Sequence, residues 1–135
     1  MVVGRTRAEL TEHGVNIGDS TLCILDEQPG LGPVGGLTTA LHHSPHDFLI
    51  VIPCDVPGLL GPALDWLLAE VTKQKQSDDP LKYHEAWAVV PTVHGRAEPL
   101  FAAYSKAVET QARGLLSTSM ASMKRLLSII DTRYV

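Results

Sequence analysis

The most informative stretch of the chain joins an apolar run to a turn that carries an acidic residue: Asp47-Phe48-Leu49-Ile50-Val51-Ile52-Pro53-Cys54-Asp55-Val56-Pro57. Five apolar residues that end at a proline predict a strand over residues 48–52, because proline cannot donate to a strand ladder. Asp55 follows directly, and the two flanking prolines stiffen the turn that carries it past the sheet edge. Mg²⁺ prefers one or two carboxylates with phosphate oxygens and water. Asp55 is therefore a candidate metal ligand and catalytic residue, with a turn-capping aspartate as the alternative.

Strands and helices alternate outward from this stretch. Val2 and Val3 would end one strand, and further strands are expected over residues 21–25, 86–91 and 99–104, with another beginning at residue 131. Helices are expected over residues 5–12, 34–42, 62–74, 106–116 and 119–130. The run over residues 21–25 is continuously apolar, which is typical of a strand buried on both faces. The alternation predicts an α/β class with a mostly parallel sheet.

A second candidate segment lies between the strand over residues 21–25 and the helix that follows it. In α/β sheets, ligands bind beyond the carboxyl ends of the strands. Asp26 stands at such an end and could contact a ribose or a base, or close an Asx-turn. Gly32, Gly35 and Gly36 let the backbone approach a ligand, and the helix offers free N–H groups to an anion. The alternative is a tight turn with a helix packed close to the sheet.

Composition excludes several classes of protein. The 135 residues carry a formal net charge of −4, which argues against nonspecific nucleic-acid binding. An apolar run of 18 residues is absent, so no membrane helix is expected. Cys23 and Cys54 have no zinc-site spacing and are interpreted as reduced, buried thiols, which indicates a cytoplasmic protein.

Histidines at two places in the chain are further candidates for a functional role. His42, His43 and His46 surround the end of a predicted helix, and a solvated helix terminus explains them better than a metal site does. His94 and Arg96 flank Gly95 in a predicted turn, where they could touch phosphate or be plain surface.

Three segments in order carry a family resemblance: Gly32-Pro33-Val34-Gly35-Gly36-Leu37, Ile50-Val51-Ile52-Pro53-Cys54-Asp55-Val56-Pro57 and Pro99-Leu100-Phe101-Ala102-Ala103-Tyr104. With them the chain resembles the molybdenum cofactor guanylyltransferases of the nucleotidyltransferase superfamily. The resemblance implies a three-layer, Rossmann-like nucleotidyltransferase fold over residues 1–135 as one partial domain. It also implies transfer of GMP from GTP to the terminal phosphate of molybdopterin, with release of pyrophosphate and with Mg²⁺ as cofactor.

The resemblance assigns roles to the candidate residues. Asp55 matches the magnesium-binding aspartate, and Asp26 matches an aspartate that helps to bind the guanine nucleotide. Gly32, Gly35 and Gly36 match the loop that approaches the nucleotide. GTP and molybdopterin would be the partners, together with a molybdoenzyme chaperone or other cofactor-biosynthesis proteins.

The chain departs from the family pattern at both ends. The family's first strand and its phosphate-holding loop, close to Leu-Ala-Gly-Gly-x-Ser-x-Arg-Met-Gly-x-Asp-Lys, have no counterpart here, and the chain stops at Tyr134-Val135 before the family's last segment. A missing central strand would leave two neighbouring strands with unpaired edges, which cost stability when buried and invite association. We therefore expect the isolated chain to be marginally folded or inactive.

Three alternatives remain open at this point. A related enzyme could use CTP on the same pterin, or transfer a nucleotide to a sugar phosphate. A catalytically dead module could keep the fold and only bind a partner.

Overall fold

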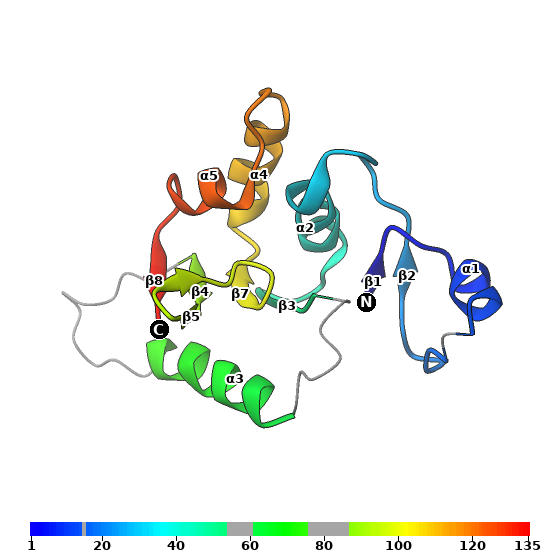
Figure 1. The fold of residues 1–135 in the computed structure, drawn as a ribbon, viewed down its shortest axis with the longest axis horizontal. Helices are drawn as coiled ribbons and strands as arrows, with labels where there is room; N and C mark the ends of the chain where they lie inside the picture. The colour runs from blue at the N-terminus through cyan, green and yellow to red at the C-terminus, as the bar shows by residue number, and fades with distance from the viewer. Residues whose placement is uncertain (15, 54–60, 76–86) are drawn as a thin grey trace.

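The computed structural model describes residues 1–14, 16–53, 61–75 and 87–135 (Figure 1). In chain order the elements are β1 (Val2–Val3), α1 (Arg7–Glu12), β2 (Cys23–Ile24), α2 (Gly32–His43), β3 (Phe48–Val51), α3 (Gly61–Lys75), β4 (Ala88–Val90), β5 (Thr92–Val93), β6 (Arg96–Ala97), β7 (Ala102–Ser105), α4 (Val108–Leu116), α5 (Met123–Leu127) and β8 (Thr132–Tyr134). The predicted alternation of strands and helices, and with it the α/β class, is confirmed.

The larger sheet has four strands in the order β3-β7-β4-β8. β7 runs antiparallel to both of its neighbours, whereas β4 and β8 are parallel. It follows that β3, β4 and β8 share one direction and that β7 alone of these four is reversed. The sheet is thus mixed, because β7 enters from the β5–β6 hairpin and not from a crossover helix.

Alternating residues of this sheet face two separate layers of helix. One face packs against α2, α4 and α5 through a core that includes Leu49, Val51, Ala88, Val90, Ala102 and Tyr104. The other face packs against Leu67 and Val71 of α3 through Phe48, Ile50, Val89 and Ala103. Figure 1 shows α3 on the opposite side of the sheet from α2, α4 and α5. The three-layer arrangement therefore follows from the period-two pattern of each strand.

The smaller parallel sheet pairs β1 with β2, with Val2 opposite Cys23 and Val3 opposite Ile24. The expectation that residues 21–25 form a strand buried on both faces is wrong. The strand is two residues long, and Leu22 and Leu25 are 54% and 62% exposed. The reason is that β1 is its sole strand partner in the described part of the chain, and no helix layer covers both of its faces.

Two helices show how local capping sets their limits. Thr6 and Glu9 form a capping box that begins α1 at Arg7, close to the predicted start. The helix expected over residues 119–130 is too long, because α5 covers only Met123–Leu127. Ser122 has extended backbone and accepts a hydrogen bond from the Arg125 amide, so the helix begins after it.

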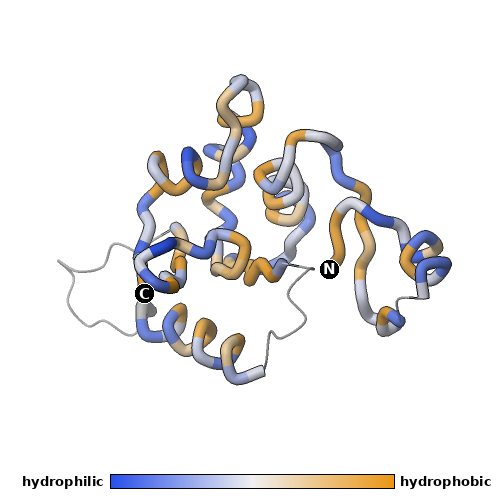
Figure 2. Tube along the Cα trace, viewed as in Figure 1, coloured by the Kyte–Doolittle hydropathy of each residue, from blue (hydrophilic) through white to orange (hydrophobic). Residues whose placement is uncertain are grey.

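An apolar groove separates the two sheets. Its volume is about 450 Å³, and it is lined by Met1, Val2, Val3, Pro33, Gly36, Leu37, Ala40, Leu49, Ile50, Val51, Ile52, Pro53 and Leu100. Among the described strands, β1 pairs with β2 and β3 pairs with β7. Figure 2 shows hydrophobic residues along both β1 and β3, on either side of the N-terminus. Within the described ranges, no helix has the length and hydropathy needed to cross a membrane.

Candidate nucleotide site

Asp26 lies in the loop that leads from β2 to α2. Its Oδ1 accepts a hydrogen bond from the Gln28 amide at 3.0 Å, which closes an Asx-turn. The same oxygen accepts a second hydrogen bond from the Thr39 hydroxyl, also at 3.0 Å. The carboxylate is therefore held both by its own loop and by α2.

The three candidate glycines differ in what surrounds them. Gly32 opens α2 with a φ of +66°, a conformation that favours glycine. Gly35 is buried, and a Cβ there would lie 3.2 Å from the Gln28 carbonyl oxygen and 3.6 Å from Asp26 Oδ2. A Cβ on Gly36 would meet nothing within 4 Å. Close packing thus accounts for Gly35, whereas Gly36 lines the groove.

The first turn of α2 has no side-chain cap. Leu31 occupies the N-cap and makes no side-chain capping hydrogen bond, and Pro33 stands within the first turn. The early amides of a helix lack intrahelical acceptors and carry the positive end of its dipole. This end of α2 can therefore receive an anionic or polar group.

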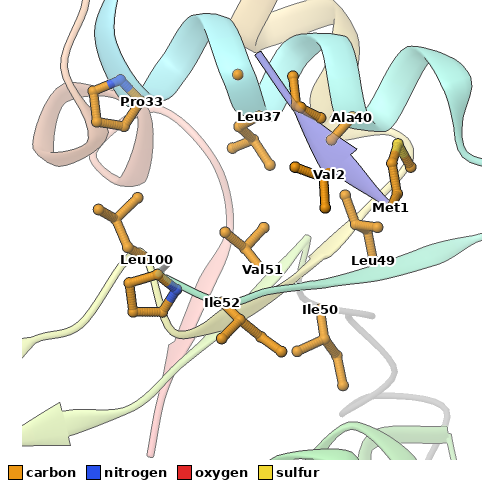
Figure 3. A pocket seen from close by; sticks show the side chains of 13 residues that line it. Met1, Val2, Pro33, Leu37, Ala40, Leu49, Ile50, Val51, Ile52 and Leu100 are labelled. Atoms are coloured by element: carbon orange, nitrogen blue, oxygen red, sulfur yellow. The ribbon is translucent and has the colours of Figure 1, made fainter. Parts of the chain in front are cut away.

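The groove connects this turn to the end of β3. Figure 3 shows Pro33 and Leu100 on one side of the groove and Met1 and Leu49 on the other. The lining residues that the structure describes are apolar, and none of them has a charged side chain.

Asp55, the predicted magnesium ligand, lies outside the described residues, as does Cys54. Pro53, two positions earlier, lines the same groove as Gly36. Within the described ranges, no group of three or more His, Cys, Asp or Glu side chains could hold a metal ion. The magnesium role of Asp55 remains a prediction.

The histidines at the end of α2 take part in an ion-pair cluster. His43 Nε2 lies 3.1 Å from Glu27 Oε1, and His42 Nδ1 lies 2.8 Å from Glu109 Oε1. Arg113 on α4 bridges both carboxylates, at 3.3 Å from Glu27 and 3.0 Å from Glu109. Burial alone would raise the pKa of Glu109, but hydrogen bonds and charge from His42 and Arg113 outweigh it and lower that pKa. The cluster joins the loop after Asp26 to α2 and α4.

His94 and Arg96 lie in the β5–β6 hairpin, and both are exposed. His94 has a φ of 51° and Gly95 a φ of +75°, which is the conformation of a two-residue hairpin turn. The predicted turn around Gly95 is therefore confirmed. A phosphate contact from His94 or Arg96 stays a prediction.

The model of one protein family covers almost the whole chain. Residues 1–132 match the family described as "MobA-like NTP transferase domain". The chain belongs to this family.

Curated relatives of this MobA-like chain carry one recurring description. A protein of Bacillus cereus (strain G9842), described as a probable molybdenum cofactor guanylyltransferase, is 31% identical over 106 residues. A protein of Bacillus mycoides (strain KBAB4) with the same description is 30% identical over 106 residues. In both cases the match covers 78% of this chain and 48% of the relative. The MobA-like chain thus spans about half the length of these relatives.

Two solved structures share the fold. The molybdopterin-guanine dinucleotide biosynthesis protein A of Archaeoglobus fulgidus superposes with a TM-score of 0.73 at 20% identity, over 98% of this chain and 60% of that one. A putative protein of Aquifex aeolicus VF5 superposes with a TM-score of 0.74 at 17% identity, over 98% of this chain and 61% of that one. These likenesses confirm the nucleotidyltransferase-type fold of the MobA-like chain.

The sequence patterns did not reveal two residues that shape this MobA-like site. The sequence pattern predicts only a helical position for Thr39 and a turn position for Glu27. Both make contacts with residues distant in the sequence. Thr39 donates a hydrogen bond to Asp26, 13 residues earlier, and Glu27 accepts one from Arg113, 86 residues later. The one available signal is the adjacent pair Thr38 and Thr39 in the apolar middle of α2, and it does not identify a partner for either hydroxyl.

Proposed function

We propose that this chain is the nucleotide-binding part of a molybdenum cofactor guanylyltransferase. The reaction transfers GMP from GTP to the terminal phosphate of molybdopterin and releases pyrophosphate. The observation that carries the proposal is the family match over residues 1–132, joined to relatives described as probable molybdenum cofactor guanylyltransferases. The expected setting is the cytoplasm.

In this reaction the phosphate of the pterin is the nucleophile, so the protein need not supply one. Its residues position the two substrates and stabilise charge. We assign Gly32, Gly35 and Gly36 to the loop that approaches the nucleotide, and Asp26 to a ribose or base contact. The uncapped first turn of α2 and the placement of Asp26 beside Gly35 support this assignment.

Asp55 is proposed as the ligand of Mg²⁺, which would neutralise phosphate charge when bound. Its place after the apolar strand β3 and between two prolines supports this role. The test is the Mg²⁺-dependent turnover of GTP and molybdopterin by the full-length gene product carrying Asp55→Asn. We expect kcat to fall by about 100-fold or more, as when other charge-stabilising groups are removed.

Asp65→Asn is the matched control, since Asp65 is exposed on α3. It should leave turnover unchanged. Near-normal turnover in Asp55→Asn would remove Asp55 from the mechanism.

The choice of nucleotide is tested separately. Titration of the full-length gene product with GTP and with CTP should show preference for GTP, whereas preference for CTP would replace the guanylyl assignment with a cytidylyl one. Turnover with a sugar phosphate in place of molybdopterin would identify the other alternative.

A binding module without activity is the remaining candidate, and it would dock on a molybdoenzyme chaperone. The genomic sequence upstream of the Met1 codon separates the two readings: an in-frame Leu-Ala-Gly-Gly-type loop supports the enzyme, and an in-frame stop supports the module.

A further inference from the structure

Thr39 is a buried hydroxyl in the middle of α2, with 1% of its surface exposed. It lies one helical turn beyond Gly35, so both residues face the same side of the helix. Its Oγ1 donates to Asp26 Oδ1 at 3.0 Å and accepts from the Glu27 amide at 3.1 Å. One side chain therefore satisfies two polar groups of the loop that carries the proposed nucleotide contact.

These hydrogen bonds make the two carboxylate oxygens of Asp26 unequal. Oδ1 receives both donors, the Thr39 hydroxyl and the Gln28 amide. In the described part of the chain no hydrogen bond reaches Oδ2. This oxygen lies 3.6 Å from the position that a Cβ on Gly35 would occupy. The carboxylate is thus held in one orientation with one oxygen available to a donor.

We propose that Thr39 is a positioning residue for nucleotide binding, which orients the Asp26 carboxylate so that Oδ2 accepts a hydrogen bond from a ribose hydroxyl or a base N–H. The inference rests on the proposed function, in which Asp26 contacts the nucleotide. Thr39 itself touches no ligand. Its effect passes entirely through Asp26.

Thr38 provides a matched control from the same helix. It is equally buried, at 2% exposed, and its hydroxyl donates to the Val34 carbonyl within α2 at 2.7 Å. Thr38→Val and Thr39→Val make the same chemical change at adjacent buried positions. Only the second removes a hydrogen bond to Asp26.

The experiment titrates the ¹⁵N-labelled full-length gene product with Mg²⁺·GTP and follows amide chemical shifts, which report weak affinities and the folding of each variant together. We expect Thr39→Val to weaken GTP binding about five-fold, the size of one lost hydrogen bond. Thr39→Ser keeps the hydroxyl and should bind within two-fold of the parent chain. Thr38→Val should do the same. Thr39→Ala replaces Thr39→Val if the valine variant does not fold.

The decisive comparison repeats Thr39→Val in an Asp26→Ala background. A further loss of less than two-fold there supports action through Asp26, since coupled residues are not additive. An equal loss in both backgrounds, or none in the parent chain, overturns the inference. If Asp26→Ala alone weakens binding but Thr39→Val does not, only the inference fails. If Asp26→Ala binds Mg²⁺·GTP as the parent does, or the parent binds none, the nucleotide role of Asp26 fails in this chain and the inference with it.

Discussion

Gly35 and Gly36 are adjacent in α2 but differ in the space around them. An alanine Cβ at Gly35 would press on the backbone oxygen of Gln28 at 3.2 Å, whereas one at Gly36 would enter open space. We expect Gly35→Ala to lower the free energy of unfolding by about 1–2 kcal/mol through overpacking. Gly36→Ala should raise it by about 0.5–1 kcal/mol, because alanine favours the helix. Urea denaturation measures both, and equal stability of the two variants would contradict the close approach of α2 to the loop.

Tyr104 is fully buried, and its hydroxyl donates to the Pro99 carbonyl at 2.7 Å. Tyr104→Phe should cost about 1 kcal/mol of stability by leaving that carbonyl without its partner. Burial, and to a lesser degree the charge of Tyr134, raises the pKa of Tyr104 above its ordinary value of 10.0. The neutral hydroxyl is therefore favoured by folding, and its stabilisation is complete below pH 10 and is lost as the pH rises above it.

Alkaline unfolding followed by circular dichroism measures this effect. The loss of stability above pH 10 should be smaller in Tyr104→Phe than in the parent chain. Tyr134→Phe is the control, because Tyr134 is exposed and should leave the alkaline limb largely as it is. The same alkaline limb in all three proteins would show that Tyr104 does not govern it.

At the scale of elements, the ion-pair cluster of Glu27, His42, His43, Glu109 and Arg113 ties α2 to α4. The pKa of Glu109 is lowered, so its contribution to stability is present above the ordinary value of 4.5 and is lost as the pH falls through the lower value in the folded chain. The side chains of the cluster are between 21% and 50% exposed, so solvent screens the ion pairs. The effect should therefore stay below about 1 kcal/mol and weaken with salt.

Glu109→Gln tests the cluster through thermal melts between pH 3 and 7 at low and high salt. The variant should be less stable than the parent near neutral pH and should approach it at acid pH. Glu12→Gln, a change on the exposed helix α1, is the control and should follow the parent at every pH. A constant difference between Glu109→Gln and the parent across this range would refute the assignment.

At the scale of the whole molecule, β1 and β3 line one apolar groove, in which Ile52 is 47% exposed. Exposed apolar patches favour association between chains, and a charge placed within one opposes it. We expect the 135-residue chain to associate as its concentration rises, and Ile52→Lys, at the end of β3 in the groove, to reduce that association. Sedimentation velocity across a hundred-fold concentration range measures it.

Ile129→Lys is the matched control, because Ile129 and Ile52 are 45% and 47% exposed but only Ile52 lines the groove. The control should associate as the parent does. Equal effects of the two substitutions would mean that general surface hydrophobicity, and not the apolar groove, drives association.

Local patterns sufficed for much of this architecture. The apolar run over residues 48–52 and its terminal proline predicted β3, and caps and periodicity predicted α2, α3 and α4 close to their observed limits. Such features depend on neighbouring residues, which a single sequence displays directly. The same holds for the candidate site residues. Asp26 and Gly32 are candidates because they lie next to the end of a predicted strand and the start of a predicted helix.

Contacts between distant parts of the chain had to come from the tertiary structure. The reversal of β7, the exposure of Leu22 and Leu25, and the hydrogen bond from Thr39 to Asp26 all depend on which elements pack together. Burial and hydrogen bonding are properties of that packing, and the residues concerned look alike in sequence whether or not a partner covers them. The sequence thus sufficed for the α/β class and the order of the elements, and it named the candidate site residues. The three-dimensional packing decided which atoms of those residues are held by hydrogen bonds from distant parts of the chain.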